Sequence, residues 1–417
     1  MKPVAAPKIV FVNRYFYPDR SATSQLLTDV ASALAESGRD VHVVCSRQRY
    51  DDSKARLAST DAVAWVAVHR VWTSRFGRDR LLGRAMDYAT FYLSSGLALL
   101  CLLKRGDTVI AKTDPPLISI IAMWAAKLKG AQLINWLQDI FPEVASLLEA
   151  NPLPPPLDAL LRRCRDLSLR SARNNVVLGE RMRERLQVMG ISPEKICIVE
   201  NWAELDPQKP KPASLSALRS RLGLGGQFVV GYSGNLGRAH EFQTLLDAAE
   251  ILQSDAAIVF LMIGGGAGMT QLNRAVLERG LKNFRFLPYQ PRESLGDCLA
   301  AADVHWVSLL PSLEGLIVPS KFYGILAAAR PVIFIGDPDG ELSRVIRAAQ
   351  CGSAVPVGDV GELVRTLRDL KADPRRLERE GGNGYRRYCE RYSARRAIED
   401  WKLIVRAQPL SRNSCKN

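Results

Sequence analysis

Apolar and polar positions along the chain alternate between two periods, and they predict repeated strands and helices. Residues 8–13 (KIVFVN) form a short run rich in β-branched side chains, as in a buried strand. Apolar side chains then recur at helical spacing from 21 to 36, Gly38 follows as a left-handed cap, and a second strand is expected at 41–45. A strand, a helix and a strand so close together predict a βαβ unit and therefore a parallel sheet.

The same alternation continues to residue 199 and begins again at residue 228. In the first half, further strands are expected at 65–71, 107–111, 132–136, 175–178 and 196–199, and helices at 80–103, 116–129, 157–171 and 180–189. In the second half, strands are expected at 228–232, 257–263, 284–286, 304–308 and 331–335, and helices at 242–252, 269–279, 295–301, 320–329, 342–348, 360–371, 375–390 and 395–406.

This organisation predicts an α/β protein with two Rossmann-like domains. A chain of 417 residues is long enough for two cores, and the proline-bearing segment 207–212 (PQKPKP) separates the two series. The expected parts are an N-terminal domain, a linker, a C-terminal domain, and a last helix and tail that pack back on the N-terminal domain: 1–205, 206–225, 226–390 and 391–417. Ligands bind at the carboxyl ends of parallel strands, so we expect the site in a deep cleft between the two domains.

The formal net charge of +14 indicates an acidic partner. Zinc-finger spacing, an aromatic RNA-binding motif and a lysine-rich tail are absent from the sequence, so phosphorylated substrates and an anionic membrane fit better than nucleic acid. The eight cysteines lie far apart, which is typical of reduced thiols in a cytosolic protein. The N-terminus lacks the apolar core of a signal peptide, and the longest apolar run, Leu93 to Leu103, is shorter than a membrane span. We therefore expect a cytoplasmic protein, peripheral on the inner face of the cytoplasmic membrane.

One candidate phosphate site lies where a helix is expected to begin, at Pro319-Ser320-Lys321. Proline and serine suit a first helical turn, whose free N–H groups bind anions, and Lys321 adds a positive charge. The alternative is an ordinary cap beside a surface lysine.

A second candidate lies between a strand and a helix, in the glycine-rich segment that contains Gly234, Asn235 and Arg238. Glycine lets the backbone approach a ligand closely, arginine can bind a diphosphate with two N–H groups, and His240 follows two residues later. The segment is not a GxxxxGK[ST] loop, which excludes an ATPase of that class. The alternative is a tight turn with a solvated arginine. Further ligand-binding candidates follow the next two predicted strands, 257–263 and 284–286. They are Gly265, Pro288 and Tyr289.

Acidic residues give two further candidates. Asp337-Pro338-Asp339 matches a DxD metal-binding pattern, but Asp-Pro is a turn former and further acids are scarce nearby, so we predict a turn, no metal and no cofactor. In the first half, Asp139 follows a strand and could orient or deprotonate an acceptor hydroxyl, although a helix cap before Pro142 is equally consistent. The other residues expected on the acceptor side are Tyr17, Ser21 and Glu143.

Four stretches together resemble a known family: 15–19 (YFYPD), 136–143 (WLQDIFPE), 231–237 (GYSGNLG), and 318–321 (VPSK) through 330–333 (RPVI). The chain is similar to the retaining, GT-B-fold glycosyltransferases of family 4, and within them to the bacterial polysaccharide branch that includes fucosamine transferases. The resemblance implies a nucleotide-sugar site in the C-terminal domain and an acceptor site in the N-terminal domain. It also implies a basic pair on the diphosphate and a Glu-x7-Glu element on the sugar and ribose.

In this sequence the resemblance makes Arg238 and Lys321 the basic pair and turns Glu314 towards the donor sugar. The second acid of the element is missing, because Phe322 or Gly324 stands there, depending on the alignment. Glu341 is one candidate to replace it. Lys321 is not at the family's commonest lysine position, which lies near His240.

These observations predict a glycosyltransferase for hexosyl or N-acetylhexosaminyl groups. The donor is a UDP-sugar or GDP-sugar, with UDP favoured, and the acceptor is a glycan or a polyprenyl-diphosphate-linked sugar. Arginines at 70, 75, 78, 80 and 84 beside the apolar run suit an anionic bilayer, whereas the plain alternative is a buried helix next to a solvated basic loop. Two other functions remain open: a UDP-sugar epimerase of the same fold, and a nucleotide-sugar-binding subunit without catalysis.

Overall fold

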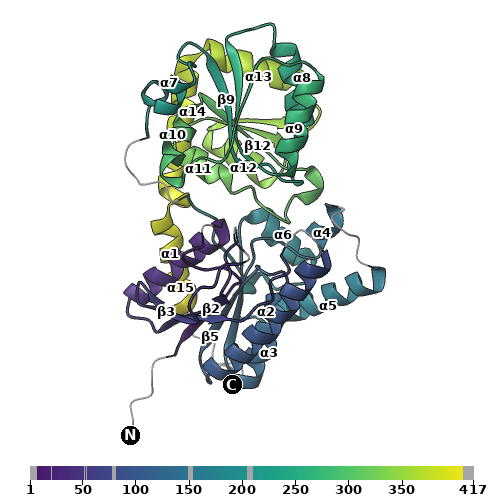
Figure 1. The fold of residues 1–417 in the computed structure, drawn as a ribbon, viewed down its shortest axis with the longest axis vertical. Helices are drawn as coiled ribbons and strands as arrows, with labels where there is room; N and C mark the ends of the chain where they lie inside the picture. Colours follow the sequence, from purple (N-terminus) through teal and green to yellow (C-terminus); the bar gives the residue numbers. More distant parts are fainter. Residues whose placement is uncertain are drawn as a thin grey trace, which may run out of the picture. The chain divides into compact units, whose positions relative to one another are not determined.

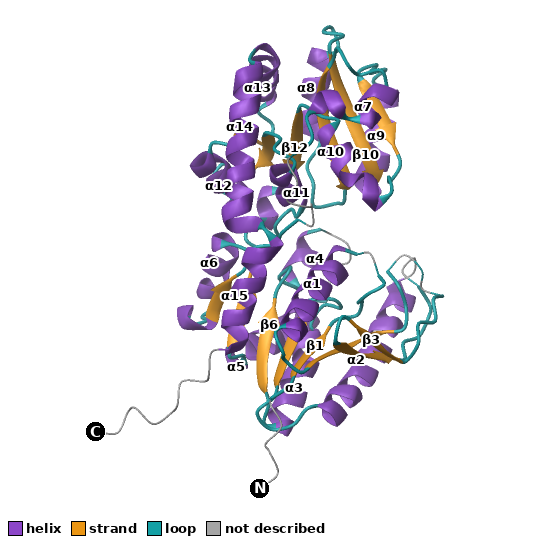
Figure 2. Cartoon of the chain, turned by 90° about the vertical axis from the view of Figure 1, so that its left-hand side faces the viewer, coloured by secondary structure: helices purple, strands orange, loops and turns teal. Residues whose placement is uncertain are grey.

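The computed structural model describes residues 7–406 except 20, 51, 53, 78–80, 149–153 and 204–209. The chain divides into two compact units, which we call unit 1 (residues 1–199 and 397–417) and unit 2 (residues 200–396). Each unit is a sheet covered by helices on both faces, as Figures 1 and 2 show. The predicted fold class, two Rossmann-like domains, is confirmed.

Unit 1 is built on one sheet with the strand order β3-β4-β2-β1-β5-β6-β7-β8. Its strands are β1 Ile9–Val12, β2 Val41–Ser46, β3 Thr60–Val63, β4 Val66–Val71, β5 Thr108–Lys112, β6 Gln132–Trp136, β7 Asn174–Val177 and β8 Ile196–Ile198. All neighbours pair in parallel except β3 and β4, which form an antiparallel hairpin at the edge. The loops after β1, β5 and β6 therefore leave the sheet along the same edge.

The helices of unit 1 lie on both faces of this sheet. They are α1 Ala22–Glu36, α2 Leu81–Leu102, α3 Ile118–Lys129, α4 Glu143–Leu147, α5 Pro155–Ser171, α6 Glu180–Val188 and α15 Ala394–Arg406. Helices α2 and α3 cover the face that carries Val10 and Val109, and together they close one hydrophobic cluster. Alternation along β5 and β6 points Lys112 and Trp136 to the other face, where the Trp401 ring of α15 lies 4.6 Å from the Trp136 ring.

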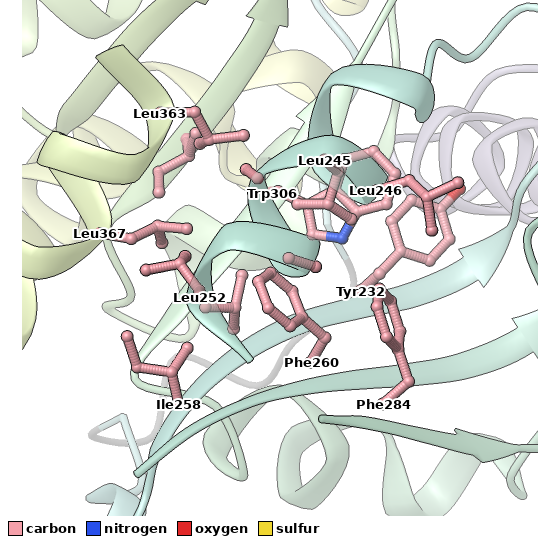
Figure 3. Close-up of a cluster of buried hydrophobic side chains, with 14 of the residues drawn as sticks. Tyr232, Leu245, Leu246, Leu252, Ile258, Phe260, Phe284, Trp306, Leu363 and Leu367 are labelled. Atoms are coloured by element: carbon pink, nitrogen blue, oxygen red, sulfur yellow. The ribbon is translucent and has the colours of Figure 1, made fainter. Parts of the chain in front are cut away.

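Unit 2 contains a fully parallel sheet with the order β11-β10-β9-β12-β13-β14. Its strands are β9 Phe228–Asn235, β10 Ile258–Gly265, β11 Phe284–Leu287, β12 Val304–Ser308, β13 Val332–Gly336 and β14 Gly352–Pro356. Its helices are α7 Ala217–Arg221, α8 Gln243–Leu252, α9 Ala267–Glu278, α10 Leu295–Ala300, α11 Lys321–Ala327, α12 Glu341–Ala349, α13 Val360–Ala372 and α14 Pro374–Arg387. The main core lies between this sheet and α8, α9 and α13, where Tyr232, Phe260 and Trp306 meet Leu245 and Leu367 (Figure 3).

Strand and helix positions predicted from the sequence are largely confirmed, and the differences have physical causes. Strands β3 and β14 were not predicted, because β3 is an exposed edge strand without alternation and β14 begins at Gly352. Much of the predicted linker 206–225 is folded onto unit 2: Leu218 and Leu224 are buried there, and the Ser216 hydroxyl caps α7. Residues 206–209 of the predicted linker lie outside the described residues.

Candidate active site

The loops that follow β9 and β12 meet at the carboxyl edge of the unit 2 sheet. β9 and β12 are neighbours, so their loops leave the sheet side by side. The Leu310 N–H donates to the Ala239 carbonyl over 2.9 Å, which ties the loop after β12 to the loop after β9. The glycine-rich segment and the segment that leads to Lys321, predicted separately, therefore belong to one site.

Lys321 is a partly buried cation at this edge. Its Nζ lies 3.4 Å from Nε2 of His240 and 5.4 Å from the centre of the Tyr232 ring. Burial lowers the pKa of the Lys321 ammonium to about 8. In the part of the chain that the structure describes, no carboxylate forms an ion pair with Lys321. A desolvated ammonium without a counter-charge gains the most when an anion binds beside it.

His240 holds the lysine through its neutral imidazole. Its Nδ1 lies 2.6 Å from the Ser308 carbonyl oxygen, and because a carbonyl can only accept, Nδ1 must carry the proton. Nε2 is then free to accept from the Lys321 ammonium. Burial, followed by the charge of Lys321, lowers the pKa of His240 to about 4, so the ring stays neutral near pH 7.

Glycines allow the backbone of β9 and β10 to come this close to the lysine. Gly234 has φ +132°, and a Cβ there would lie 2.8 Å from Cε of Lys321. Gly264 has φ +127°, and a Cβ there would lie 2.1 Å from the Gly234 carbonyl oxygen. Only glycine fits these positions, so their role is a close approach of chain segments.

Two polar side chains after β9 face solvent. Asn235 ends the strand and Arg238 follows in the loop, and both are exposed. Among the described residues the Arg238 guanidinium has no ion-pair or hydrogen-bond partner. It is thus free to bind an anion.

The predicted helix start at Pro319-Ser320 is the start of α11. Pro319 is buried, Ser320 is exposed at the N-cap, and the Ser320 side chain makes no capping bond. Lys321 is the first residue of α11, so its positive charge lies at the same end of the helix as the free N–H groups of the first turn.

Glu314 is tied to the start of α12. Its Oε1 accepts the Glu341 N–H over 2.6 Å, and a Cβ at Gly340 would lie 2.6 Å from its Oε2. The Glu314 carboxylate thus caps α12. This contact places Glu341, the candidate to replace the missing acid of the Glu-x7-Glu element, next to Glu314. At the two positions considered for that acid, Phe322 is fully buried and Gly324 packs near Leu299.

The loops after β10 and β11 complete this edge of unit 2. The Tyr289 ring lies against Gly265, where a Cβ would be 2.9 Å from its Cε2, and its side chain is 61% exposed. Pro288 connects Tyr289 to the end of β11. An exposed ring beside a glycine is a suitable surface for stacking a planar ligand group.

Asp337-Pro338-Asp339 forms the predicted turn. The Asp337 side chain accepts the Asp339 N–H over 2.8 Å, and Asp339 pairs with Arg344 over 2.8 Å.

In unit 1, Asp139 lies at the carboxyl edge of the sheet, after β6. Its Oδ1 is enclosed and has no hydrogen-bond partner among the described residues. Burial, assisted by the nearby charge of Asp114, raises the pKa of Asp139 to about 7. A carboxyl group with that pKa can exchange a proton near neutral pH.

The other residues expected on the acceptor side have clear structural partners. Both Glu143 oxygens accept from the Arg165 guanidinium, at 2.8 and 2.9 Å, so Glu143 anchors α5 rather than facing solvent. The Ser21 hydroxyl donates to Asp19 over 2.5 Å. Tyr17 is half exposed, and its carbonyl accepts from Arg70.

Two residues at these edges were missed by sequence reasoning. The Tyr232 ring packs beside Lys321. Its position within the glycine-rich segment could have identified it as a site residue. Lys112 is fully buried, its Nζ lies 3.5 Å from the centre of the Trp136 ring, and it has no hydrogen-bond partner among the described residues. A lysine at the end of an apolar strand is usually exposed, so the sequence did not indicate that Lys112 is buried.

Two family models match the chain, one in each unit. The Glycosyl transferase 4-like domain matches residues 23–202, and Glycosyl transferases group 1 matches residues 217–387. WbjE of Pseudomonas aeruginosa, a glycosyltransferase by name, is 28% identical over 71% of this chain and 74% of its own. WcaI of Escherichia coli K12, named as a colanic acid biosynthesis glycosyl transferase, is 24% identical over 81% of this chain and 85% of its own.

Solved structures share the fold over nearly the whole chain. Anabaena HepE in complex with UDP and glucose has a TM-score of 0.71 at 16% identity, covering 96% of this chain and 100% of HepE. WaaG, a glycosyltransferase involved in lipopolysaccharide biosynthesis, has a TM-score of 0.67 at 14% identity, covering 96% of this chain and 100% of WaaG.

Proposed function

We propose that this chain, which belongs to the family 4 glycosyltransferases and has their GT-B fold, transfers a sugar from a UDP-sugar. The transfer would be a step in the synthesis of a bacterial surface polysaccharide. The transferred group is a hexosyl or N-acetylhexosaminyl residue, and the anomeric configuration is retained. The fucosamine-transferase branch is the part of the family that the sequence resembles, which favours an amino sugar.

The observation that carries the donor assignment is the partly buried ammonium of Lys321, which has no ion-pair partner among the described residues. A diphosphate supplies the counter-charge that this ammonium lacks, and Arg238 and the N–H groups at the start of α11 lie in adjoining segments of the same edge. Negative charge on the diphosphate grows as the bond to the sugar breaks. Cations already in place stabilise that charge more in the transition state than in the bound donor, which is how they accelerate the reaction.

The rest of the donor is assigned to the surrounding loops. The exposed Tyr289 ring and Gly265 would take the base, with Asn235 and Gly234 along the diphosphate. Glu314 and Glu341 would lie towards the sugar and the ribose. HepE, with the same fold, has been solved with UDP and glucose, which supports UDP as the nucleotide.

The acceptor is assigned to unit 1, at the loops after β1, β5 and β6. Asp139 would orient the attacking hydroxyl or take its proton. We propose a glycan or a polyprenyl-diphosphate-linked sugar as the acceptor. A lipid-linked acceptor implies a cytoplasmic enzyme working at the inner face of the membrane.

Calorimetric titration of the full chain with UDP, GDP, ADP and dTDP tests the donor assignment. We expect UDP to bind, and Arg238→Ala to weaken its binding by roughly tenfold or more. Arg274→Ala is the matched control, because this arginine is exposed on α9 and pairs only with its helix neighbour Glu278 among the described residues. Failure of all four nucleotides to bind would contradict the donor site, and tighter binding of GDP would replace UDP by GDP.

A further inference from the structure

Helix α2 of unit 1 is apolar on its outer side as well as on the side that it buries. Every residue exposed on the described part of α2 is apolar or a cysteine, and these residues follow a helical stripe that includes Leu82, Met86, Ala89, Leu93 and Leu97. Leu93 and Leu97 are 71% and 66% exposed. A surface helix of a globular protein normally presents polar side chains to water, so an exposed apolar side of this length is unusual.

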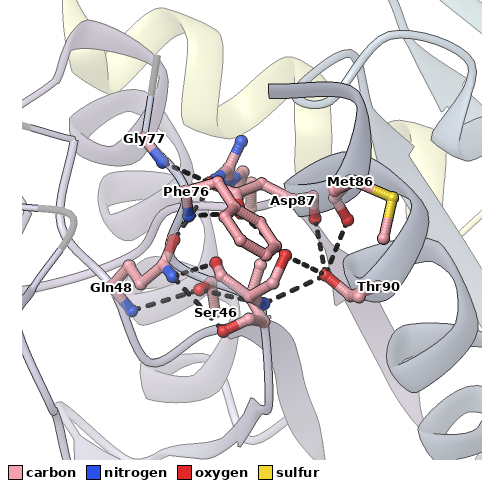
Figure 4. Close-up of polar contacts among 10 residues, drawn as sticks. Ser46, Gln48, Phe76, Gly77, Met86, Asp87 and Thr90 are labelled. Atoms are coloured by element: carbon pink, nitrogen blue, oxygen red, sulfur yellow. Dashed lines mark hydrogen bonds and ion pairs between the residues drawn. The ribbon is translucent and has the colours of Figure 1, made fainter. Parts of the chain in front are cut away.

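A buried polar anchor fixes α2 in this orientation (Figure 4). Asp87 is almost completely buried; it accepts from the Phe76 and Gly77 N–H groups, at 3.0 and 3.2 Å, and from the Ser74 hydroxyl at 2.7 Å. It also pairs with the buried Arg14 over 3.4 Å. Turning the helix over would leave Arg14 buried without a counter-charge, so the apolar stripe is held on the outside.

Helix α3 continues the apolar surface. α2 and α3 approach closely, since a Cβ at Gly96 would lie 3.1 Å from Cγ2 of Ile121. On α3, Trp124 and Leu128 are 53% and 72% exposed. We call the surface formed by Leu82, Met86, Leu93, Leu97, Trp124 and Leu128 the α2–α3 face.

Positive charges gather at one end of the α2–α3 face. Lys104 and Arg105 follow α2, while Lys127 and Lys129 lie in the last turn of α3. The two ends are adjacent, because the Gly106 N–H donates to the Gly130 carbonyl over 3.0 Å. The sequences of α2 and α3 contain one acidic residue, the buried Asp87, so nothing on these helices offsets the charge at the surface.

We propose that the α2–α3 face docks unit 1 on an anionic lipid bilayer. Exposed leucines would enter the acyl boundary, the Trp124 ring suits the interface, and the lysines reach anionic headgroups with their long stems. A second copy is a poorer occupant, because it would bring the same cation cluster to the interface. By length and composition α2 is the single described helix that could cross a membrane, yet its Phe91 and Leu99 side is packed in the core of unit 1. It therefore lies on the bilayer. Docking of unit 1 on a bilayer rests on the proposed function, which assigns the acceptor to this unit, but vesicle binding is measured without any transfer reaction.

Co-sedimentation of the full chain with vesicles tests this proposal. One set of vesicles is pure phosphatidylcholine, and the other contains about one third phosphatidylglycerol, an anionic lipid. We expect binding to the anionic vesicles. Leu93→Ser with Leu97→Ser should lower the partition coefficient roughly tenfold or more, and Lys127→Gln with Lys129→Gln should do the same by weakening attraction to the headgroups.

Leu277→Ser is the matched control, since Leu277 is 73% exposed on α9 of unit 2 and should bind like the unchanged protein. The substituted residues are exposed, apart from the half-buried Lys129, so unchanged thermal melting would show that folding is preserved. Unchanged binding of the double serine variant would overturn the proposal, as would failure of the unchanged protein to bind anionic vesicles. Sedimentation velocity adds one more outcome: a dimer that dissociates in the double serine variant would make a second copy the occupant instead.

Discussion

Nζ of Lys321 lies 3.4 Å from Nε2 of His240, although the two residues are 81 positions apart in the chain. The ring nitrogen opposite is held by the Ser308 carbonyl, so His240 presents a lone pair and adds no positive charge. The pair leaves the lysine cationic, desolvated and pointed at the carboxyl edge of the sheet.

Replacing Lys321 by alanine should lower kcat/KM by about 100-fold or more, because the charge that develops on the diphosphate would lose its nearest cation. Steady-state release of UDP is the measurement. Thermal melting serves as the check on folding, since removal of a desolvated ammonium should not destabilise unit 2. An effect within about threefold would remove Lys321 from the leaving-group role.

The pH profile of kcat/KM should be bell-shaped. Asp139, with its raised pKa of about 7, becomes the carboxylate only as the pH rises through that value, so the acidic limb belongs to it. Lys321, with its lowered pKa of about 8, loses its proton above that value, so the rate falls on the alkaline side. Asp139→Asn should remove the acidic limb, and Lys321→Arg should shift the alkaline limb upward because arginine stays protonated. If both limbs of the pH profile remain unchanged in these variants, the two limbs belong to other titrating groups.

The ion pair between Glu143 and Arg165 should matter more for stability than for acceptor binding. Burial alone would raise the pKa of Glu143, but the hydrogen bonds and charge of Arg165 lower it overall. Glu143→Ala leaves the buried Arg165 with Asp166 as its remaining ion-pair partner among the described residues, and it should reduce the free energy of unfolding by about 2 kcal/mol. Because a lowered carboxyl pKa stabilises only above the unfolded value, this loss should vanish as the pH falls through the folded pKa. Glu180→Ala, which breaks an exposed pair with Arg183, is the control with little expected change in urea denaturation.

Glu314 offers a way to separate a positioning role from a charge on the sugar. Glu314→Gln keeps an oxygen that can accept the Glu341 N–H, whereas Glu314→Ala does not. If Glu314 mainly positions the start of α12, the glutamine variant should retain most of kcat while the alanine variant loses it. Equal losses in both variants, with KM for the donor unchanged, would point to the negative charge itself.

The reaction should proceed without a divalent metal. In the proposed donor site Lys321 and Arg238 would supply the positive charge on the diphosphate, while the carboxylates of Asp337 and Asp339 are engaged within their own turn and with Arg344. Treatment with EDTA followed by desalting should leave the initial rate unchanged. If the initial rate falls after EDTA treatment and returns when Mg²⁺ or Mn²⁺ is added, a divalent metal takes part in the reaction.

Much of the candidate site could be predicted from the sequence because its parts are local. Gly234 and Arg238 follow a strand, and Pro319 and Lys321 start a helix; such patterns need only neighbouring residues. The distant relations could not be read in the same way. The bond between Glu314 and Glu341 spans 27 positions, and it depends on how the loop after β12 meets the loop after β13. Helix α7 was likewise hidden within a segment whose prolines suggested a linker.

By itself the sequence determined the alternation of strands and helices, and hence two parallel sheets, because side-chain periodicity reports local backbone geometry. Tertiary structure alone decided which side of each element is buried. In α2 apolar side chains lie on both sides of the helix, so the sequence pattern does not decide which side is buried. The buried charge of Arg14 requires Asp87 on the inside, and this requirement keeps Leu93 and Leu97 on the surface.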